Sequence, residues 1–347
     1  MSMKPQQKAF VTLAQVAARA GVSPGAASVA IRGDAGNCSI GVSKKVAARV
    51  RKVAAEMGYR PSATARAMCH RATRQIGVIL PNRQNEPGTG PMTFETINGI
   101  NSGLQDAGRL MVLARLHDVL ENVEHGSRVF REDALDGAIV IGAIDRDALK
   151  WIGGQFAKCV WCDTNVWSGR GCVRRDEKAA GRMACANALE AGFGELVWVG
   201  NDESPARHFS ARERLAGASA CCAAAGRALA KMNIREFARQ PAKNFRGRCL
   251  IAESYPIAQR LGVLLGRAKM VPGRDVGVAC CDDPHEMSWA WPELSRARFD
   301  RYQMGRRAAE MMLKMLDTPG ETPRSERLAS EWIAGETIGV KRKELRG

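Results

Sequence analysis

The sequence predicts a small all-α head joined to a larger α/β body of two lobes with parallel sheets. Residues 1–75 carry 13 Lys and Arg against only Asp34 and Glu56, a net charge of +11, and the rest of the chain supplies the other +5 of the formal +16. Apolar residues recur at helical spacing in this head, whereas the body alternates short apolar runs with helical patterns. A basic head on a nearly balanced body is typical of nucleic-acid binding, because phosphate neutralisation supplies much of the affinity.

The first two helices of the head are predicted by their capping residues. Thr12 and Gln15 have the spacing of a capping box, in which each side chain satisfies an N–H group at the helix start. Gly21 ends this helix, Ser23 can cap the next one, and Pro24 suits its first turn. The inner face of the first helix consists of Leu13, Val16, Ala17 and Ala20.

A third helix follows a loop and begins after Ser43, a good N-cap residue. Its predicted inner face consists of Val46, Val50, Val53 and Met57. Its outer face is basic and consists of Lys44, Lys45, Arg49, Arg51 and Lys52. The turn spacing and the charge asymmetry together favour a helix-turn-helix. The alternative is an amphipathic bundle whose basic face is only solvated.

Three segments of the head carry a resemblance to a known family. Val11-Thr12-Leu13, Ala20-Gly21-Val22-Ser23 and Gly58-Tyr59-Arg60-Pro61 stand in the order and spacing of the lactose/galactose repressor family, which the chain resembles weakly along nearly its whole length. The resemblance implies a helix-turn-helix DNA-binding domain at residues 1–60 and a hinge helix or linker at 61–74. It implies a periplasmic-binding-protein-like domain of two lobes at 75–347 for effector binding and dimerisation.

The resemblance also implies which residues contact DNA. Val29 stands where the family commonly has an Arg, and Pro24 and Gly25 occupy positions that often read base edges, so Arg32 is a substitute candidate. Met68 stands where the family has a Leu that wedges into the minor groove; the alternative is an ordinary linker residue. The implied contact residues are Thr12, Leu13, Ser23, Pro24, Gly25, Ala26, Ser28, Val29, Arg32, Ser43, Tyr59, Ser62, Ala65, Arg66 and Met68.

The body is predicted to contain buried parallel strands, because its strand-like runs are almost continuously apolar. These runs are residues 76–80, 110–116, 138–141, 160–162, 196–200, 250–252 and 276–280. Helices are expected at 95–107 and 302–316. By resemblance, a ligand cleft lies between the lobes, and the chain crosses from lobe to lobe near Asp176, near Phe299 and around residue 325.

Four charged residues of the body are candidates for effector binding by resemblance. Arg214 lies in a helix start, Asp282 and Asp163 follow strands, and Glu253 stands where the family usually has an Asn-Asp pair. Strand C-terminal ends are where open α/β sheets bind ligands. The substitution at Glu253 indicates either an effector other than a simple neutral sugar or a pocket without tight ligand control. For each of these charged residues the alternative is a solvated position on the surface. Four tryptophans could stack on a sugar ring or belong to the core, namely Trp161, Trp167, Trp289 and Trp291.

Several classes of protein are not supported by the sequence. Residues 1–20 lack the apolar region of a secretory signal, and no run of about 18 apolar residues is present, so we expect a cytoplasmic protein. Eleven cysteines, an odd number, suit a reducing compartment. Cys159 and Cys162 are expected on opposite sides of a strand, which argues against a redox or metal site. We expect no cofactor, no metal and no enzymatic activity, because the common catalytic motifs are missing.

The sequence therefore predicts a sequence-specific DNA-binding transcription regulator, a repressor, that binds a double-stranded operator. A small-molecule effector, a sugar or sugar acid, is expected between the lobes. A homodimer is favoured over a tetramer because no heptad pattern follows Trp332. The alternatives are an effector-independent regulator with a structural cleft, and a carbohydrate-handling enzyme or binding protein.

Overall fold

A computed structural model describes residues 11–32, 41–62, 72–81, 91–116, 130, 132–142, 146–201, 208–283 and 293–339. The chain divides into two compact units, Met1–Thr73 and Arg74–Gly347. They are called the head and the body below, and each is described by itself.

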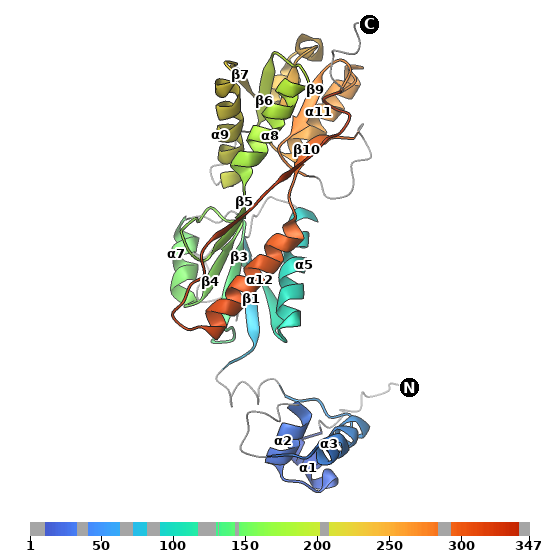
Figure 1. Cartoon of the computed structure of the whole chain (residues 1–347), viewed down its shortest axis with the longest axis vertical. Coiled ribbons are helices and arrows are strands. Elements are labelled where there is room, and N and C mark those ends of the chain that lie inside the picture. The colour runs from blue at the N-terminus through green and yellow to red at the C-terminus, as the bar shows by residue number, and fades with distance from the viewer. Residues whose placement is uncertain are drawn as a thin grey trace, which may run out of the picture. The chain divides into compact units, whose positions relative to one another are not determined.

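The head contains the three expected helices, α1 (Leu13–Ala20), α2 (Pro24–Arg32) and α3 (Lys44–Glu56) (Figure 1). The capping box is present, because the Gln15 N–H donates to Thr12 Oγ1 at 3.3 Å and the Thr12 N–H donates to Gln15 Oε1 at 2.8 Å. Ser23 and Ser43 cap α2 and α3 from one side only, as their hydroxyl oxygens accept from the N–H groups of Ala26 and Val46. Gly21 ends α1 in the left-handed conformation, with φ 65°.

Small residues make the core of the head. Its fully buried members are Val16, Ala17, Ala20, Ala27, Ala30, Ala47, Val50 and Ala54. Of the predicted inner-face residues, Leu13 of α1 and Val46, Val53 and Met57 of α3 are only partly buried against this core, and α3 instead buries Ala47, Val50 and Ala54. Arg51 was expected on the outer basic face, but its Nε donates to the carbonyl oxygen of Ala30 at 2.9 Å. It thus satisfies one of the carbonyls that a helix leaves free at its C-terminal end.

The body has two lobes, each built on a six-stranded sheet. The first sheet is parallel throughout and has the order β11-β5-β4-β3-β1-β2, with β1 (Gln75–Pro81), β2 (Leu110–Leu116), β3 (Gly137–Ile141), β4 (Cys159–Cys162), β5 (Cys172–Arg175) and β11 (Glu326–Leu328). The second has the order β12-β10-β9-β8-β6-β7, with β6 (Leu196–Gly200), β7 (Leu229–Asn233), β8 (Cys249–Ala252), β9 (Gly277–Cys280), β10 (Ser295–Arg298) and β12 (Glu331–Ile333). Only β12 is antiparallel to its neighbour. The predicted parallel sheets are confirmed.

Helices cover both faces of each sheet (Figure 1). In lobe 1, α5 (Pro91–Asp106) and α12 (Arg301–Asp317) pack together on one face and α7 (Arg146–Gln155) covers the other. In lobe 2, one face carries α8 (Glu177–Glu190) and α9 (Phe209–Ala224), and the other carries α10 (Ile234–Arg239), η1 (Ala242–Phe245) and α11 (Tyr255–Arg267). Burial on both faces explains why the central strands are almost wholly apolar. None of the described helices is long and apolar enough to cross a membrane.

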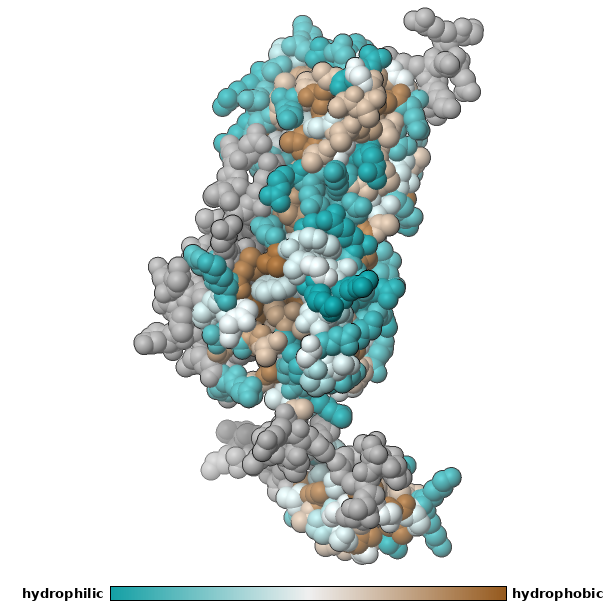
Figure 2. All heavy atoms as spheres, turned by 60° about the vertical axis from the view of Figure 1, so that its left-hand side comes forward, coloured by the Kyte–Doolittle hydropathy of each residue, from teal (hydrophilic) through white to brown (hydrophobic). Residues whose placement is uncertain are grey.

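Figure 2 shows one side of the molecule, where hydrophilic side chains cover much of the body and hydrophobic ones show as smaller areas between them. The large apolar side chains instead fill the cores on either side of the sheets. Cys159 and Cys162 lie in different cores, on opposite faces of the first sheet, as the strand pattern predicted. Burial raises the pKa of Cys159 to about 12, so this thiol stays protonated and unreactive.

The chain crosses between the lobes three times. It crosses at Asp176 between β5 and α8, at Phe299 and Asp300 between β10 and α12, and at residues 329–330 between β11 and β12. The first two crossings lie where the sequence predicted, and the third lies slightly beyond the expected residue 325. In Figure 1 the ribbon from β11 to β12 runs from one lobe into the other.

Glycines bring the backbones of α8 and α9 into direct contact. A Cβ added at Gly181 would lie 1.9 Å from the carbonyl oxygen of Arg214, and one added at Gly217 would lie 1.9 Å from that of Lys178. No side chain fits at either position without moving the helices apart. This contact sets how closely Arg214 approaches the start of α8.

We therefore expect Gly181→Ala to lower the free energy of unfolding by about 1–3 kcal/mol or more, because the added methyl group overpacks the helix pair. Gly266→Ala is the matched control: Gly266 also lies in a helix of lobe 2, and an added Cβ there meets nothing within 4 Å. The control should be neutral or stabilising by up to about 1 kcal/mol. Urea denaturation followed by circular dichroism measures both, and equal effects of the two changes would contradict this packing.

Candidate functional site

Most of the predicted DNA-contact residues that the structure describes are exposed or half-buried, and several of them lie at the starts of α2 and α3. The exposed candidates for DNA contact are Thr12, Ser23, Pro24, Gly25, Ser43 and Ser62, and the half-buried ones are Leu13, Ala26, Ser28 and Tyr59. Val29 is only 3% exposed and packs inward, so its side chain is not available to a partner in this structure. Ala65, Arg66, Met68 and the side chain of Arg32 lie outside the described residues.

The charge of the described part of the head suits an anionic partner. Within residues 11–32 and 41–62 the only acidic residue is Glu56, and no acidic residue lies in the first turn of any of the three helices. The exposed basic residues there include Arg19, Lys44, Lys45, Arg49, Lys52 and Arg60. Free N–H groups at helix starts and nearby cations both attract phosphate.

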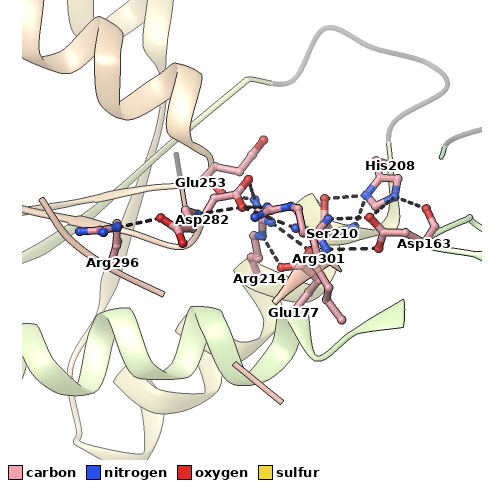
Figure 3. Close-up of polar contacts among 11 residues, drawn as sticks. Asp163, Glu177, His208, Ser210, Arg214, Glu253, Asp282, Arg296 and Arg301 are labelled. Atoms are coloured by element: carbon pink, nitrogen blue, oxygen red, sulfur yellow. Dashed lines mark hydrogen bonds and ion pairs between the residues drawn. The ribbon is translucent and has the colours of Figure 1, made fainter. Parts of the chain in front are cut away.

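In the body, the four candidate effector residues come together in one buried polar cluster (Figure 3). Asp163 follows β4, Glu253 follows β8 and Asp282 follows β9, while Arg214 lies in the second turn of α9. Arg214 is only 2% exposed, and Glu253 and Asp282 are also buried. The sequence thus identified residues that meet in space although they come from distant segments.

Arg214 uses most of its donors on the chain itself. Its Nε and Nη2 donate to the two carboxylate oxygens of Glu177 at 2.6 and 2.9 Å. Its Nη1 donates to Asp282 Oδ2 at 3.1 Å and to the carbonyl oxygen of Glu253 at 2.9 Å. The side chain of Glu253 lies over Gly200, where an added Cβ would come within 2.5 Å of Oε2. Glu253 therefore contributes its backbone to Arg214, which the sequence did not predict.

Arg175, Glu177 and Arg301 were not among the candidates, yet they complete the cluster. Arg175 Nη2 lies 2.9 Å from both Asp163 Oδ2 and Glu177 Oε1, and its Nη1 lies 3.5 Å from Asp282 Oδ1. Arg301 Nη2 donates to the same Asp282 oxygen at 2.5 Å. The sequence contained one signal for Arg175: it ends a short buried strand, β5, where a charged side chain is unfavourable unless it has a partner. Its partners are set by the crossing of the chain and not by local pattern.

The charges inside the cluster cancel. Three guanidinium groups, of Arg175, Arg214 and Arg301, face the carboxylates of Asp163, Glu177 and Asp282. Burial opposes ionisation of Asp282, but the surrounding arginines hold its pKa far below the usual range. Burial likewise opposes the charge on Arg214, yet Asp282 and Glu177 raise its pKa. These three arginines and three carboxylates balance one another in charge, while the carboxyl group of Glu253 lies apart from them over Gly200.

A second set of contacts joins the lobes beside the cluster. His208, the N-cap of α9, places Nε2 2.7 Å from the carbonyl oxygen of Asp163 and Nδ1 2.8 Å from Ser210 Oγ. The Phe209 N–H donates to Asn165 Oδ1 at 2.8 Å. Burial lowers the pKa of His208, so its ring is neutral near pH 7 and Nε2 donates to the carbonyl.

Of the four candidate tryptophans, the two that the structure describes, Trp161 and Trp167, do not line the buried cluster. Trp161 packs against the core beneath α7. Trp167 stacks on Arg174, whose guanidinium carbon lies 4.2 Å from the ring centre. Arg174 also bonds Glu213 at 2.8 Å. Trp289 and Trp291 lie outside the described residues.

We expect Asp282→Asn to lower the free energy of unfolding by about 3–5 kcal/mol at pH 7, because it leaves buried guanidinium charge without its partner. The folded pKa of Asp282 is depressed, so its contribution is present above the unfolded value of about 3.9 and is lost as the pH falls toward the folded pKa. The difference between wild type and variant should thus be constant from pH 7 to about 4 and shrink below it. Denaturant titrations across this range measure it.

Asp106→Asn is the control, since Asp106 also pairs with an arginine, Arg306, but is 63% exposed. Its effect should stay within about 0.5 kcal/mol at every pH. An Asp282→Asn effect as small as that of the control would show that the buried cluster does not stabilise the body.

The chain is similar to known proteins in both sequence and fold. Residues 186–338 match the family model of a periplasmic binding protein-like domain. The chain is 29% identical over 191 residues to the HTH-type transcriptional regulator GntR of Pseudomonas aeruginosa, covering 54% of this chain and only 53% of that relative's length. It is 24% identical over 319 residues to the ribose operon repressor of Bacillus subtilis, covering 88% of this chain and 92% of that protein.

Among solved structures, the chain is similar to the lac repressor dimer bound to operator and the anti-inducer ONPF. The TM-score is 0.77 with 16% sequence identity, over 95% of this chain and 100% of that one. The transcriptional regulator CelR in complex with cellobiose is similar with a TM-score of 0.65 and 20% identity, over 94% and 99%. These likenesses show the fold, and the curated relatives named above are transcription regulators and not enzymes.

Proposed function

We propose that this chain, a relative of the lactose/galactose repressors, is a sequence-specific DNA-binding transcription regulator, a repressor, that acts as a homodimer in the cytoplasm. Its partners would be a double-stranded DNA operator and a small-molecule effector, a sugar or sugar acid. The observation that carries the proposal is the capped, basic three-helix head joined to a body with the periplasmic-binding-protein-like fold.

The DNA-binding part of the proposal rests on the exposed start of α2 and on the basic residues of α3. Ser23, Pro24 and Gly25 are exposed at the start of α2, which is slim enough to enter a major groove. These short residues offer few base contacts, so phosphate contacts from the basic residues would supply most of the affinity. By resemblance, Ala65, Arg66 and Met68 of the hinge would reach the minor groove.

Phosphate binding by α3 can be tested without knowing the operator. We expect Lys45→Gln to weaken binding to a random-sequence duplex and to reduce the log–log slope of affinity against salt by about one, since one phosphate contact is lost. Fluorescence anisotropy from low to moderate salt measures the slope. Lys314→Gln, which removes an exposed charge of the body, is the control and should leave the slope unchanged. A wild-type slope near zero would overturn the proposed DNA binding.

The homodimer part of the proposal is supported by exposed apolar side chains around the edge of lobe 1. Leu110 and Leu113 on the edge strand β2 are 62% and 50% exposed, and Phe94 at the start of α5 is 58% exposed. Burying such side chains against a second copy would favour association.

We expect Leu113→Lys to shift the dimer toward monomer, because it places a charge in the proposed interface and on an edge strand. Sedimentation velocity at several concentrations measures the change. Glu190→Lys, a charge change at an exposed end of α8, should leave the association unchanged. A dimer of unaltered strength in the Leu113→Lys variant would place the interface elsewhere.

The effector part of the proposal rests on the position of Asp282 after β9 and of Arg214 in the second turn of α9, which meet at the junction of the lobes. A thermal-shift screen with sugars, sugar acids and nucleosides tests it, followed by operator binding with any ligand found. The second candidate is a regulator that needs no effector. It is favoured by one observation: the donors of Arg214 are largely occupied by Glu177, Asp282 and Glu253.

A further inference from the structure

Three ion pairs of the buried cluster cross from one lobe to the other. Arg175 ends β5 and Arg301 begins α12, so both belong to lobe 1. Glu177 begins α8 and Asp282 follows β9, so both belong to lobe 2. The contacts of Arg175 with Glu177 at 2.9 Å and with Asp282 at 3.5 Å, and of Arg301 with Asp282 at 2.5 Å, therefore join the lobes.

The carboxylates of Glu177 and Asp282 already accept hydrogen bonds from the guanidinium groups to which a ligand would have to bind. Glu177 is 0% exposed and holds Arg214 through both of its oxygens. Asp282 accepts from Arg214, Arg175 and Arg301, and also from the N–H of Asp283 at 3.0 Å. Figure 3 shows Glu177, Arg214, Asp282 and Arg301 grouped together, joined by dashed lines. Fork-like pairing of this kind is among the strongest polar interactions in proteins.

An aromatic ring at the second crossing holds two of the arginines in place. The guanidinium carbons of Arg175 and Arg301 lie 5.0 and 5.9 Å from the ring centre of Phe299, which is buried. The two cations are thus held both by the aromatic ring and by carboxylates. Separating the lobes would leave buried charges without partners, which is costly.

We propose that Glu177 and Asp282 act as built-in anionic ligands that lock the two lobes together in the absence of any small molecule. Taken with the proposed function, which it deepens, this lock makes the joined arrangement of the lobes the resting state of the regulator. An effector that acts at this junction must compete with carboxylates for the arginines. It is therefore an acid and not a neutral sugar.

Hydrogen exchange on the full-length protein, with no DNA and no small molecule added, tests the lock. The Phe209 N–H bonds Asn165 across the lobes and reports on their contact, whereas amides of β8 report on the folding of lobe 2 alone. In the wild type we expect Phe209 to be protected. In the Arg175→Gln/Arg301→Gln double variant its exchange should be at least tenfold faster, with β8 still protected.

Arg296→Gln is the matched control, because Arg296 bonds Asp283 at 2.8 Å and both residues belong to lobe 2. It should change the exchange of Phe209 by less than twofold. If β8 loses protection in the double variant, the experiment uses the Glu177→Gln variant instead, because this change keeps the shape of the side chain. Glu177→Gln should likewise accelerate exchange of the Phe209 amide. An unprotected Phe209 amide in the wild type, or unchanged protection in the cluster variants, would overturn the lock.

The effector class is tested by thermal shift with D-glucuronate and D-glucose. Weakening the lock with Glu177→Gln frees the fork of Arg214, so stabilisation by glucuronate should increase while that by glucose does not. Stabilisation of the wild type by glucose alone would overturn the acid requirement. Neither assay contains DNA, so failure of the lock is distinguishable from failure of the proposed DNA binding.

Discussion

Asp282 accepts hydrogen bonds from three arginines that reach it from three different segments of the chain, and the arrangement of the body depends on this meeting point. Each arginine is buried, so each requires a carboxylate within reach. Arg214 comes from α9, Arg175 from the end of β5 and Arg301 from the start of α12. The relative position of these elements is constrained by a charge balance as well as by apolar packing.

The glycine contact between α8 and α9 makes this charge balance geometrically possible. Gly181 and Gly217 let the two helix backbones touch, which brings Arg214 to the first turn of α8, where Glu177 lies. A wider helix pair would separate the guanidinium from its carboxylate. The pairing of Arg214 with Glu177 thus depends on the close packing of the two helices at Gly181 and Gly217.

Local patterns were sufficient for the head and for the central strands. Thr12, Ser23 and Ser43 cap helices through contacts no more than three residues away, so sequence spacing fixes them. The central strands were recognisable because both of their faces are buried and their residues are apolar. The strands β5, β7, β10, β11 and β12 were not recognised, since they lie toward sheet edges or carry charged residues such as Arg174 and Arg175.

For the candidate site, sequence motifs placed Asp163, Arg214, Glu253 and Asp282 at strand or helix ends, and all four lie in or beside the buried cluster. What the motifs did not contain was the pairing among these residues. Arg175, Glu177 and Arg301 meet their partners only because the chain crosses between the lobes at Asp176 and again at Phe299. Local capping and hydrophobic periodicity are properties of neighbouring residues and can be read along the chain. Which buried charge meets which is a long-range consequence of two lobes folding against each other, and only the tertiary structure decides it.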